Sequence, residues 1–186
     1  MENKDVTFNS KKPKLFVVYG HSNTGKTKII NALKKKMLEE SGWEDVTTKC
    51  GVDVSGILKK YQLQQSNSND IFFVLKKNDV LIGLFSEGDY PRLWLFIWIL
   101  IFIIGCSGVV IATSDSEKLL PFVDYFEKIQ KDAGLENVEF FKTKRYRNGK
   151  NTNKDDRIKD AKFDVRIFER IEEIFIKGPT ATEGKK

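Results

Sequence analysis

The chain has 186 residues, which is enough for one domain with a single hydrophobic core. Apolar residues make up 40% and charged residues 31% of it, with a formal net charge of +6, and this balance excludes an intrinsically disordered chain. Two cysteines, Cys50 and Cys106, and one histidine, His21, exclude a disulfide framework, a histidine-ligated metal site and most histidine-based catalysis. The first residues lack the apolar segment of a secretory signal, so we expect a cytoplasmic protein.

The first third of the chain predicts strands and helices in alternation. Residues 14–19 (KLFVVY) form a short apolar run between a proline and a glycine, which indicates a central strand. Apolar residues then recur at helical spacing over residues 27–40, with lysines between them. Residues 46–50 indicate a short strand, residues 53–65 a helix, and the Ser/Asn repeat at 66–69 a loop.

A β-hairpin is predicted over about residues 71–86. Two strand-like runs, 71–75 and 80–85, are separated by a short polar segment in which Asn78 and Asp79 supply turn chemistry.

The most apolar part of the chain, residues 93–112, is long enough to cross a membrane and carries no charge. The turn signal GCSG at residues 105–108 interrupts it, and β-branched residues at 109–112 indicate a strand. We therefore expect a buried helix over residues 91–104 and then a buried parallel strand, with a membrane-associated protein as the weaker alternative. Because this helix is apolar on all sides it must be covered, and a homodimer contact is one way to cover it.

The remaining elements are a helix over about residues 119–129, a strand at 139–142 and a final helix between residues 158 and 175. Strands that alternate with helices predict a single α/β domain over residues 13–177, with a mainly parallel sheet. The two ends, residues 1–12 and 178–186, are expected to be flexible tails.

One motif carries chemistry, and it lies between the first predicted strand and the first predicted helix. The pattern G-x-x-x-x-G-K-S/T is matched without exception by Gly20, His21, Ser22, Asn23, Thr24, Gly25, Lys26 and Thr27. Glycines let the backbone wrap around phosphate, so that its N–H groups and the N-terminus of the helix bind the phosphate oxygens. Lys26 would reach the β- and γ-phosphates and the Thr27 hydroxyl would ligate Mg²⁺. The predicted phosphate site consists of these eight residues and Lys28.

On this motif and its context, the chain resembles the P-loop NTPase superfamily. In its size and its VLIGLFSEGD stretch it resembles, more loosely, small bacterial and phage P-loop proteins of the nucleotide-kinase or ATPase type. The resemblance implies a three-layer fold, a mainly parallel sheet flanked by helices, with ATP and Mg²⁺ as ligands. The chain departs from the superfamily pattern because no apolar strand ends directly in Asp-Asp, Asp-Glu or Asp-Gly.

A Mg²⁺ ion that bridges two phosphates normally has an acidic residue beside it, at the end of a strand near the phosphate loop. Asp89 is the preferred metal ligand and Asp115 the other candidate, since each follows an apolar strand. Glu87 is better placed to polarise a water molecule or a substrate hydroxyl. Thr113 and Ser114 occupy a position from which a polar residue can sense the γ-phosphate. Turn or helix-capping roles explain all five residues as well.

The basic segment at residues 142–154 has three interpretations. It could be a lid over the phosphates, with Arg145 or Arg147 stabilising the charge of the transition state. It could be a groove for nucleic-acid phosphates, in which Tyr146 stacks on a base. It could also be a solvated surface loop.

The sequence thus favours a nucleotide-kinase-like phosphotransferase or an ATPase, whose phosphoryl acceptor could be a nucleotide or a nucleic-acid end. The alternative is a nucleotide-dependent switch. GTP is a weaker candidate ligand for it, because the chain contains the short patterns D-x-x-G at residues 53–56 and N-K-x-D at residues 153–156.

Overall fold

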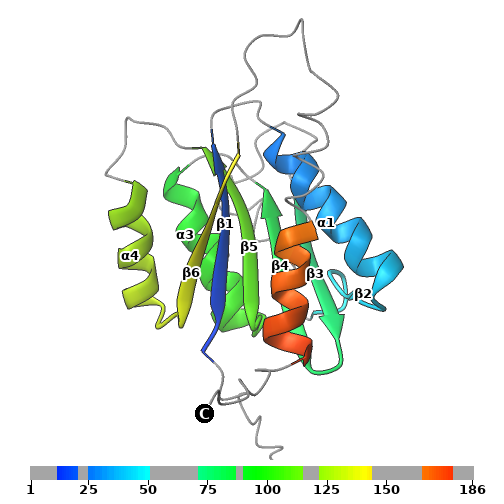
Figure 1. The fold of residues 1–186 in the computed structure, drawn as a ribbon. Coiled ribbons are helices and arrows are strands. Elements are labelled where there is room, and N and C mark those ends of the chain that lie inside the picture. Colours follow the sequence, from blue (N-terminus) through cyan, green and yellow to red (C-terminus); the bar gives the residue numbers. More distant parts are fainter. Residues whose placement is uncertain are drawn as a thin grey trace, which may run out of the picture.

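A computed structural model gives the fold of the chain (Figure 1). It describes residues 12–20, 25–50, 71–86, 90–114, 122–143 and 165–177. Within these residues, one sheet of 6 strands has the order β2-β3-β4-β5-β1-β6. The strands are β1 (Lys14–Gly20), β2 (Glu44–Asp45), β3 (Ile71–Lys77), β4 (Val80–Ser86), β5 (Gly108–Ser114) and β6 (Asn137–Lys142).

Most of this sheet is parallel. β4, β5, β1 and β6 run in one direction, whereas β3 pairs antiparallel with both β2 and β4. The β3–β4 pair is the predicted hairpin, and its turn places Asn78 at φ 54, a left-handed conformation that asparagine tolerates better than most residues. The α/β class, the mainly parallel sheet and the hairpin are therefore confirmed.

Helices cover both faces of the sheet (Figure 1). On one face lie α1 (Lys26–Glu40) and a helix over residues 165–177, which ends in the π-helical turn η2 (Glu172–Lys177). On the other face lie α3 (Tyr90–Trp98), its π-helical continuation η1 (Ile99–Ile103), and α4 (Phe122–Asp132).

The two cores follow from the alternation of side chains along the strands. Leu15 and Val17 of β1 pack toward α3 and α4, while Phe16 and Val18 pack toward α1, and all four side chains are fully buried. A parallel strand that is buried on both faces needs such a continuous apolar run, which explains why β1 could be recognised in the sequence.

The short strand expected at residues 46–50 is wrong. The strand is β2, two residues earlier, and the chain turns after Asp45. The Thr47 hydroxyl donates a hydrogen bond of 2.6 Å to Asp45 Oδ1 and accepts one of 2.9 Å from the backbone N–H of Val74. The Thr47 hydroxyl thus accepts the hydrogen bond from β3 that a backbone carbonyl of a longer β2 would accept. The strand can therefore end at Asp45.

The apolar segment 93–112 forms a helix and then a strand, as predicted. The helix packs so closely on β4 that a Cβ atom on Gly83 would lie 2.6 Å from the Leu100 side chain. After η1 the chain turns and returns through the sheet as β5. In the part of the chain that the structure describes, no helix has the length and apolar character needed to cross a membrane.

In the single chain this helix is not fully covered, and the expected covering by a second copy stays a prediction. Trp98 is 42% exposed, and Phe102 and Ile103 are each 47% exposed. The Trp98 and Phe102 rings lie 5.7 Å apart, so they form one small aromatic patch.

Several expected elements lie outside the described residues: the helix at 53–65, the start of the helix predicted from residue 119, and the residues before 165 of the last helix. Both predicted tails lie outside them as well. The last strand begins two residues earlier than expected, at Asn137.

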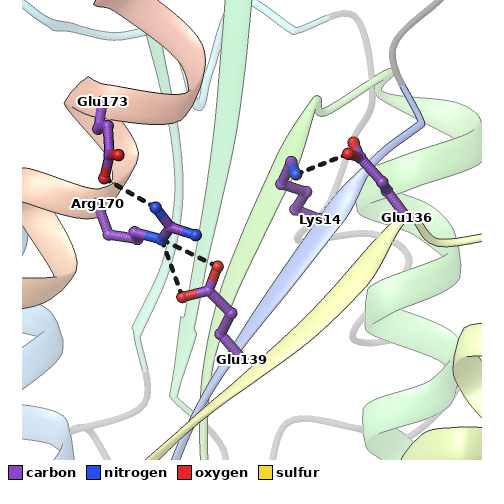
Figure 2. A network of polar contacts seen from close by, with 5 residues as sticks. All are labelled: Lys14, Glu136, Glu139, Arg170 and Glu173. Atoms are coloured by element: carbon purple, nitrogen blue, oxygen red, sulfur yellow. Dashed lines mark hydrogen bonds and ion pairs between the residues drawn. The ribbon is translucent and has the colours of Figure 1, made fainter. Parts of the chain in front are cut away.

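Ion pairs hold the edge strand β6 in place. Lys14 Nζ at the start of β1 lies 3.0 Å from Glu136 Oε1, just before β6 (Figure 2). Arg170 of the last helix lies 3.1 Å from Glu139 of β6 and 2.8 Å from Glu173 (Figure 2). Hydrogen bonding to Glu173, followed by the charge of Glu139, raises the pKa of Arg170 above its ordinary value. These ion pairs are partly exposed to solvent, so each contributes little to the free energy of unfolding. Their main effect is to fix the position of β6.

A buried acidic residue connects three distant segments. Glu172 of η2 accepts a hydrogen bond of 2.9 Å from Trp43 Nε1 and lies 3.1 Å from Lys77 Nζ at the end of β3. Its side chain is 11% exposed and that of Lys77 is 21% exposed, so this pair is largely removed from water. Removing either charge of this pair would leave the other one without a counter-charge in a largely buried site, which destabilises the fold.

We predict that Glu172→Gln destabilises the fold by about 2–3 kcal/mol, because an amide leaves the Lys77 ammonium without a counter-charge in a largely buried site. The matched control is Glu39→Gln, since Glu39 is 63% exposed and lies 3.9 Å from Lys35. The control should change stability by less than about 0.5 kcal/mol. Urea unfolding of both variants measures the difference, and equal losses would contradict the prediction.

Candidate functional site

The carboxyl ends of the four parallel strands meet at one edge of the sheet. Gly20 at the end of β1 is in register with Ser114 of β5, and Ser86 at the end of β4 is in register with Ala112. The connection that leaves β1 contains α1 on one face and leads to β2, whereas the connection from β5 to β6 contains α4 on the other face. Ligands of open α/β sheets bind where the connections diverge in this way, which here is at the ends of β1 and β5.

Hydroxyl side chains are buried at this same edge. Among the described residues, the buried polar or charged side chains are those of Ser86, Thr113, Thr143 and Glu172. The first three are at most 3% exposed, and each lies at the carboxyl end of a different strand, namely β4, β5 and β6. A concentration of buried hydroxyls at the edge where ligands bind marks it as the candidate site.

The first turn of α1 contacts the end of β4 through two hydroxyls. Thr27 Oγ1 and Ser86 Oγ are 2.7 Å apart, and either can be the donor. Strand alternation places Ser86 on the same face as Ile82 and Leu84, which pack in the core beneath α1. The contact therefore fixes where α1 begins relative to the edge of the sheet.

The chain enters α1 through a glycine that adopts a conformation few other residues accept. Gly25 precedes α1 with φ 82 and ψ 14, in the left-handed region, and no side chain caps the helix. Lys26 Nζ donates a hydrogen bond of 3.0 Å to the carbonyl oxygen of Gly20, so the lysine bends back over the end of β1. A helix that begins in this way presents backbone N–H groups and a positive dipole end to an anion.

The close packing of Thr143 against the end of β1 requires a glycine at position 20. Thr143 donates two hydrogen bonds to the carbonyl oxygen of Tyr19, from its backbone N–H at 2.7 Å and from its hydroxyl at 3.1 Å. This brings Thr143 so close to β1 that a Cβ atom on Gly20 would lie 2.0 Å from Thr143 Oγ1. The first glycine of the motif is thus needed for packing between β1 and the end of β6.

Thr113 is a buried polar group without a hydrogen bond. Its side chain is fully buried, and its Oγ1 has no hydrogen-bond partner among the described residues. Leaving such a group unpaired costs about 1–3 kcal/mol. Strand alternation places Thr113 on the face of β5 that carries Ile111, opposite to the face of Ser86. The two hydroxyls therefore approach the edge from different sides.

The structure brings together Gly20, Gly25, Lys26 and Thr27, and it leaves Lys28 exposed on α1. The other predicted site residues lie outside the described residues: His21, Ser22, Asn23, Thr24, Glu87, Asp89, Asp115, Arg145 and Arg147. The patterns at 53–56 and 153–156 lie outside them too, as does the basic segment after Thr143.

Sequence reasoning missed Ser86 and Thr143. The signal for Ser86 is that it is the first polar residue after the apolar run of β4, at the point where the superfamily pattern has an acid. Thr143 has a similar signal, since it follows the end of β6 directly.

The described carboxyl ends of the four parallel strands carry no acidic residue, and the end of β6 carries the basic Lys142. Across the described residues, no group of three or more His, Cys, Asp and Glu side chains could hold a metal ion. Because this edge holds the Lys26 ammonium as well as buried hydroxyls, it suits an anion better than a bare cation. The Thr27 hydroxyl can supply one oxygen ligand to Mg²⁺, which fits an ion that arrives bound to phosphate.

The buried thiol of Cys106 takes no part in this site. Burial, followed by the nearby Cys50, raises the pKa of Cys106 well above its ordinary value, so the thiol stays protonated and unreactive.

Comparisons of the chain with models of protein families, with curated proteins and with solved structures found no match.

We predict that Gly20→Ala destabilises the fold by about 2–4 kcal/mol, because the new Cβ atom overlaps Thr143 Oγ1. Gly134→Ala is the control, since Gly134 has φ +60 and open space around it. The control should cost only the strain of its backbone conformation, about 1–2 kcal/mol. Adding Thr143→Ala to Gly20→Ala should recover part of the loss. Thermal or urea unfolding tests this, and an equal cost for the two glycine variants would contradict it.

Proposed function

We propose that the chain is a P-loop NTPase that binds ATP with Mg²⁺ and transfers or hydrolyses the γ-phosphoryl group. The observation that carries the proposal is the location of the two ends of the GHSNTGKT motif. Gly20 ends β1 and Gly25 opens α1, at the edge where the connections of β1 and β5 diverge. The mainly parallel sheet between two layers of helices is compatible with the three-layer fold of that superfamily.

Each described residue of the motif has a role in this proposal. Gly25 turns the chain so that the first N–H groups of α1 face a phosphate. The Lys26 ammonium, which lies 3.0 Å from the Gly20 carbonyl, exchanges this contact for oxygens of the β- and γ-phosphates. The Thr27 hydroxyl is the protein ligand of Mg²⁺. When bound, the ion supplies neutralisation of the phosphate charge.

Catalysis in this proposal consists of positioning and charge stabilisation. Asp89 or Asp115 would complete the surroundings of the ion, and Glu87 would polarise the attacking water molecule or acceptor hydroxyl. Arg145 or Arg147 would stabilise the charge of the transition state if the segment at residues 142–154 closes over the phosphates.

A nucleotide-dependent switch is the second candidate, and one specific observation favours it. β4 ends in the neutral Ser86 rather than in a carboxylate, and none of the described residues at the parallel strand ends is acidic. If Ser86, and not one of the acidic residues that follow the described strand ends, faces the ion, the site binds nucleotide but hydrolyses it slowly. The output would then be a change of partner rather than a product, with GTP as well as ATP to be tested.

We expect Lys26→Ala to weaken ATP binding about 100-fold or more, because it removes a charged donor to two phosphates. The matched control is Lys35→Ala on the exposed side of α1, where the lysine side chain is 72% exposed. This control should bind as the unchanged protein does. Isothermal titration calorimetry measures both, and unchanged affinity in Lys26→Ala would remove the proposed phosphate site.

Incubation with γ-labelled ATP distinguishes the two candidates. The reaction contains Mg²⁺ and a panel of nucleotides, nucleosides and oligonucleotides as acceptors. A labelled acceptor would identify a phosphotransferase, and labelled phosphate alone would identify an ATPase. Tight binding of ATP or GTP without turnover would favour the switch, and the absence of binding to any nucleoside triphosphate would contradict the whole proposal.

A further inference from the structure

The contact between Thr27 and Ser86 connects the proposed metal ligand to a strand end that lacks a carboxylate. The two oxygens are 2.7 Å apart, at the optimal distance for an O–H···O bond, and Ser86 is only 3% exposed. The two residues are 59 positions apart in the chain, so their contact depends on the packing of α1 against β4.

A hydroxyl that ligates a cation must do so through a lone pair on its oxygen. Its proton then points away from the ion and needs an acceptor, and for Thr27 the acceptor at hand is Ser86 Oγ. In the protein without ligands either hydroxyl can donate, so ligand binding would select one of the two directions. Ser86 can accept this proton without bringing a negative charge to the strand end.

We propose that Ser86 is a positioning residue for the metal ion: it accepts the Thr27 proton and so turns a Thr27 oxygen lone pair toward the Mg²⁺ that arrives with the nucleotide. This inference rests on the proposed function, since it needs a nucleotide at the motif. Because Ser86 is neutral, it does not act on the phosphates by charge, and its effect on the ion passes through the Thr27 hydroxyl. We therefore expect its contribution to nucleotide binding to be larger with the metal than without it.

The test is a comparison of ATP affinity with Mg²⁺ and with a chelator in its place. The ratio of the two affinities measures the contribution of the metal, and a purely structural role of Ser86 would not change this ratio. Ser86→Ala should lower the ratio about 5- to 10-fold, the value of one hydrogen bond to a charged group, and change the affinity in chelator less than the affinity with Mg²⁺. Ser86→Thr keeps the hydroxyl and should keep the ratio.

Two further variants complete the design. Ser86→Cys has nearly the size of serine but is a weak acceptor, so it should lower the ratio as Ser86→Ala does, and it replaces that variant if alanine prevents folding. Ser107→Ala is the matched control, because Ser107 lies at the opposite edge of the sheet, before β5, and should leave the ratio unchanged. Circular dichroism establishes that each variant is folded.

The outcomes separate the inference from the proposed function. If the unchanged protein binds no nucleotide in either condition, both fail. If it binds nucleotide and the ratio is the same in Ser86→Ala and Ser86→Cys as in the unchanged protein, only the inference fails. An equal loss of affinity with metal and with chelator would also overturn it, since Ser86 would then stabilise the motif and not the metal ion.

Discussion

Parallel pairing between β1 and β5 is the constraint on which the rest of the structure depends. Both strands are buried on both faces, and their register aligns Gly20 with Ser114. The pairing fixes where β1 ends, and therefore where the chain must leave the sheet to begin α1. Because α1 then packs on the face that carries Leu84, its first turn reaches the end of β4. The proposed phosphate site is a consequence of this order of strands.

Hydroxyl side chains at the strand ends allow a candidate binding site without placing an unpaired charge in the fold. A carboxylate at the position of Ser86, which is 3% exposed, would need a counter-charge whenever no metal ion is bound. Ser86 and Thr27 instead form a hydrogen bond with each other, so burying the Ser86 hydroxyl costs little free energy of folding when no ligand is bound. In the proposed function, a hydroxyl holds a cation more weakly than a carboxylate does, and the phosphates of the nucleotide would supply negative charge to the ion.

The class of fold and the strand-to-helix junction between β1 and α1 could be predicted from the sequence, because both depend on local patterns. Apolar runs mark β1 and β5 directly, and the spacing of glycine, lysine and threonine marks the strand-to-helix junction. Contacts between distant segments could not be predicted in this way. Ser86 looks like an ordinary turn residue until α1 packs beside it. Glu172, in a charged stretch of a helix, looks exposed until Trp43 and Lys77 approach it from elsewhere in the chain.

The ion pairs around β6 also bear on self-association. Among the described residues, β6 is the last strand of the sheet and pairs only with β1, and an edge strand of this kind can pair with a strand of another chain. Phe140, which is 40% exposed, makes this side attractive to a second chain. Glu139 and Lys142 flank the two aromatic residues of β6, and a strand docked there would have to bury their charges. Glu139, which helps to align the strand through Arg170, therefore also protects it against edge-to-edge aggregation.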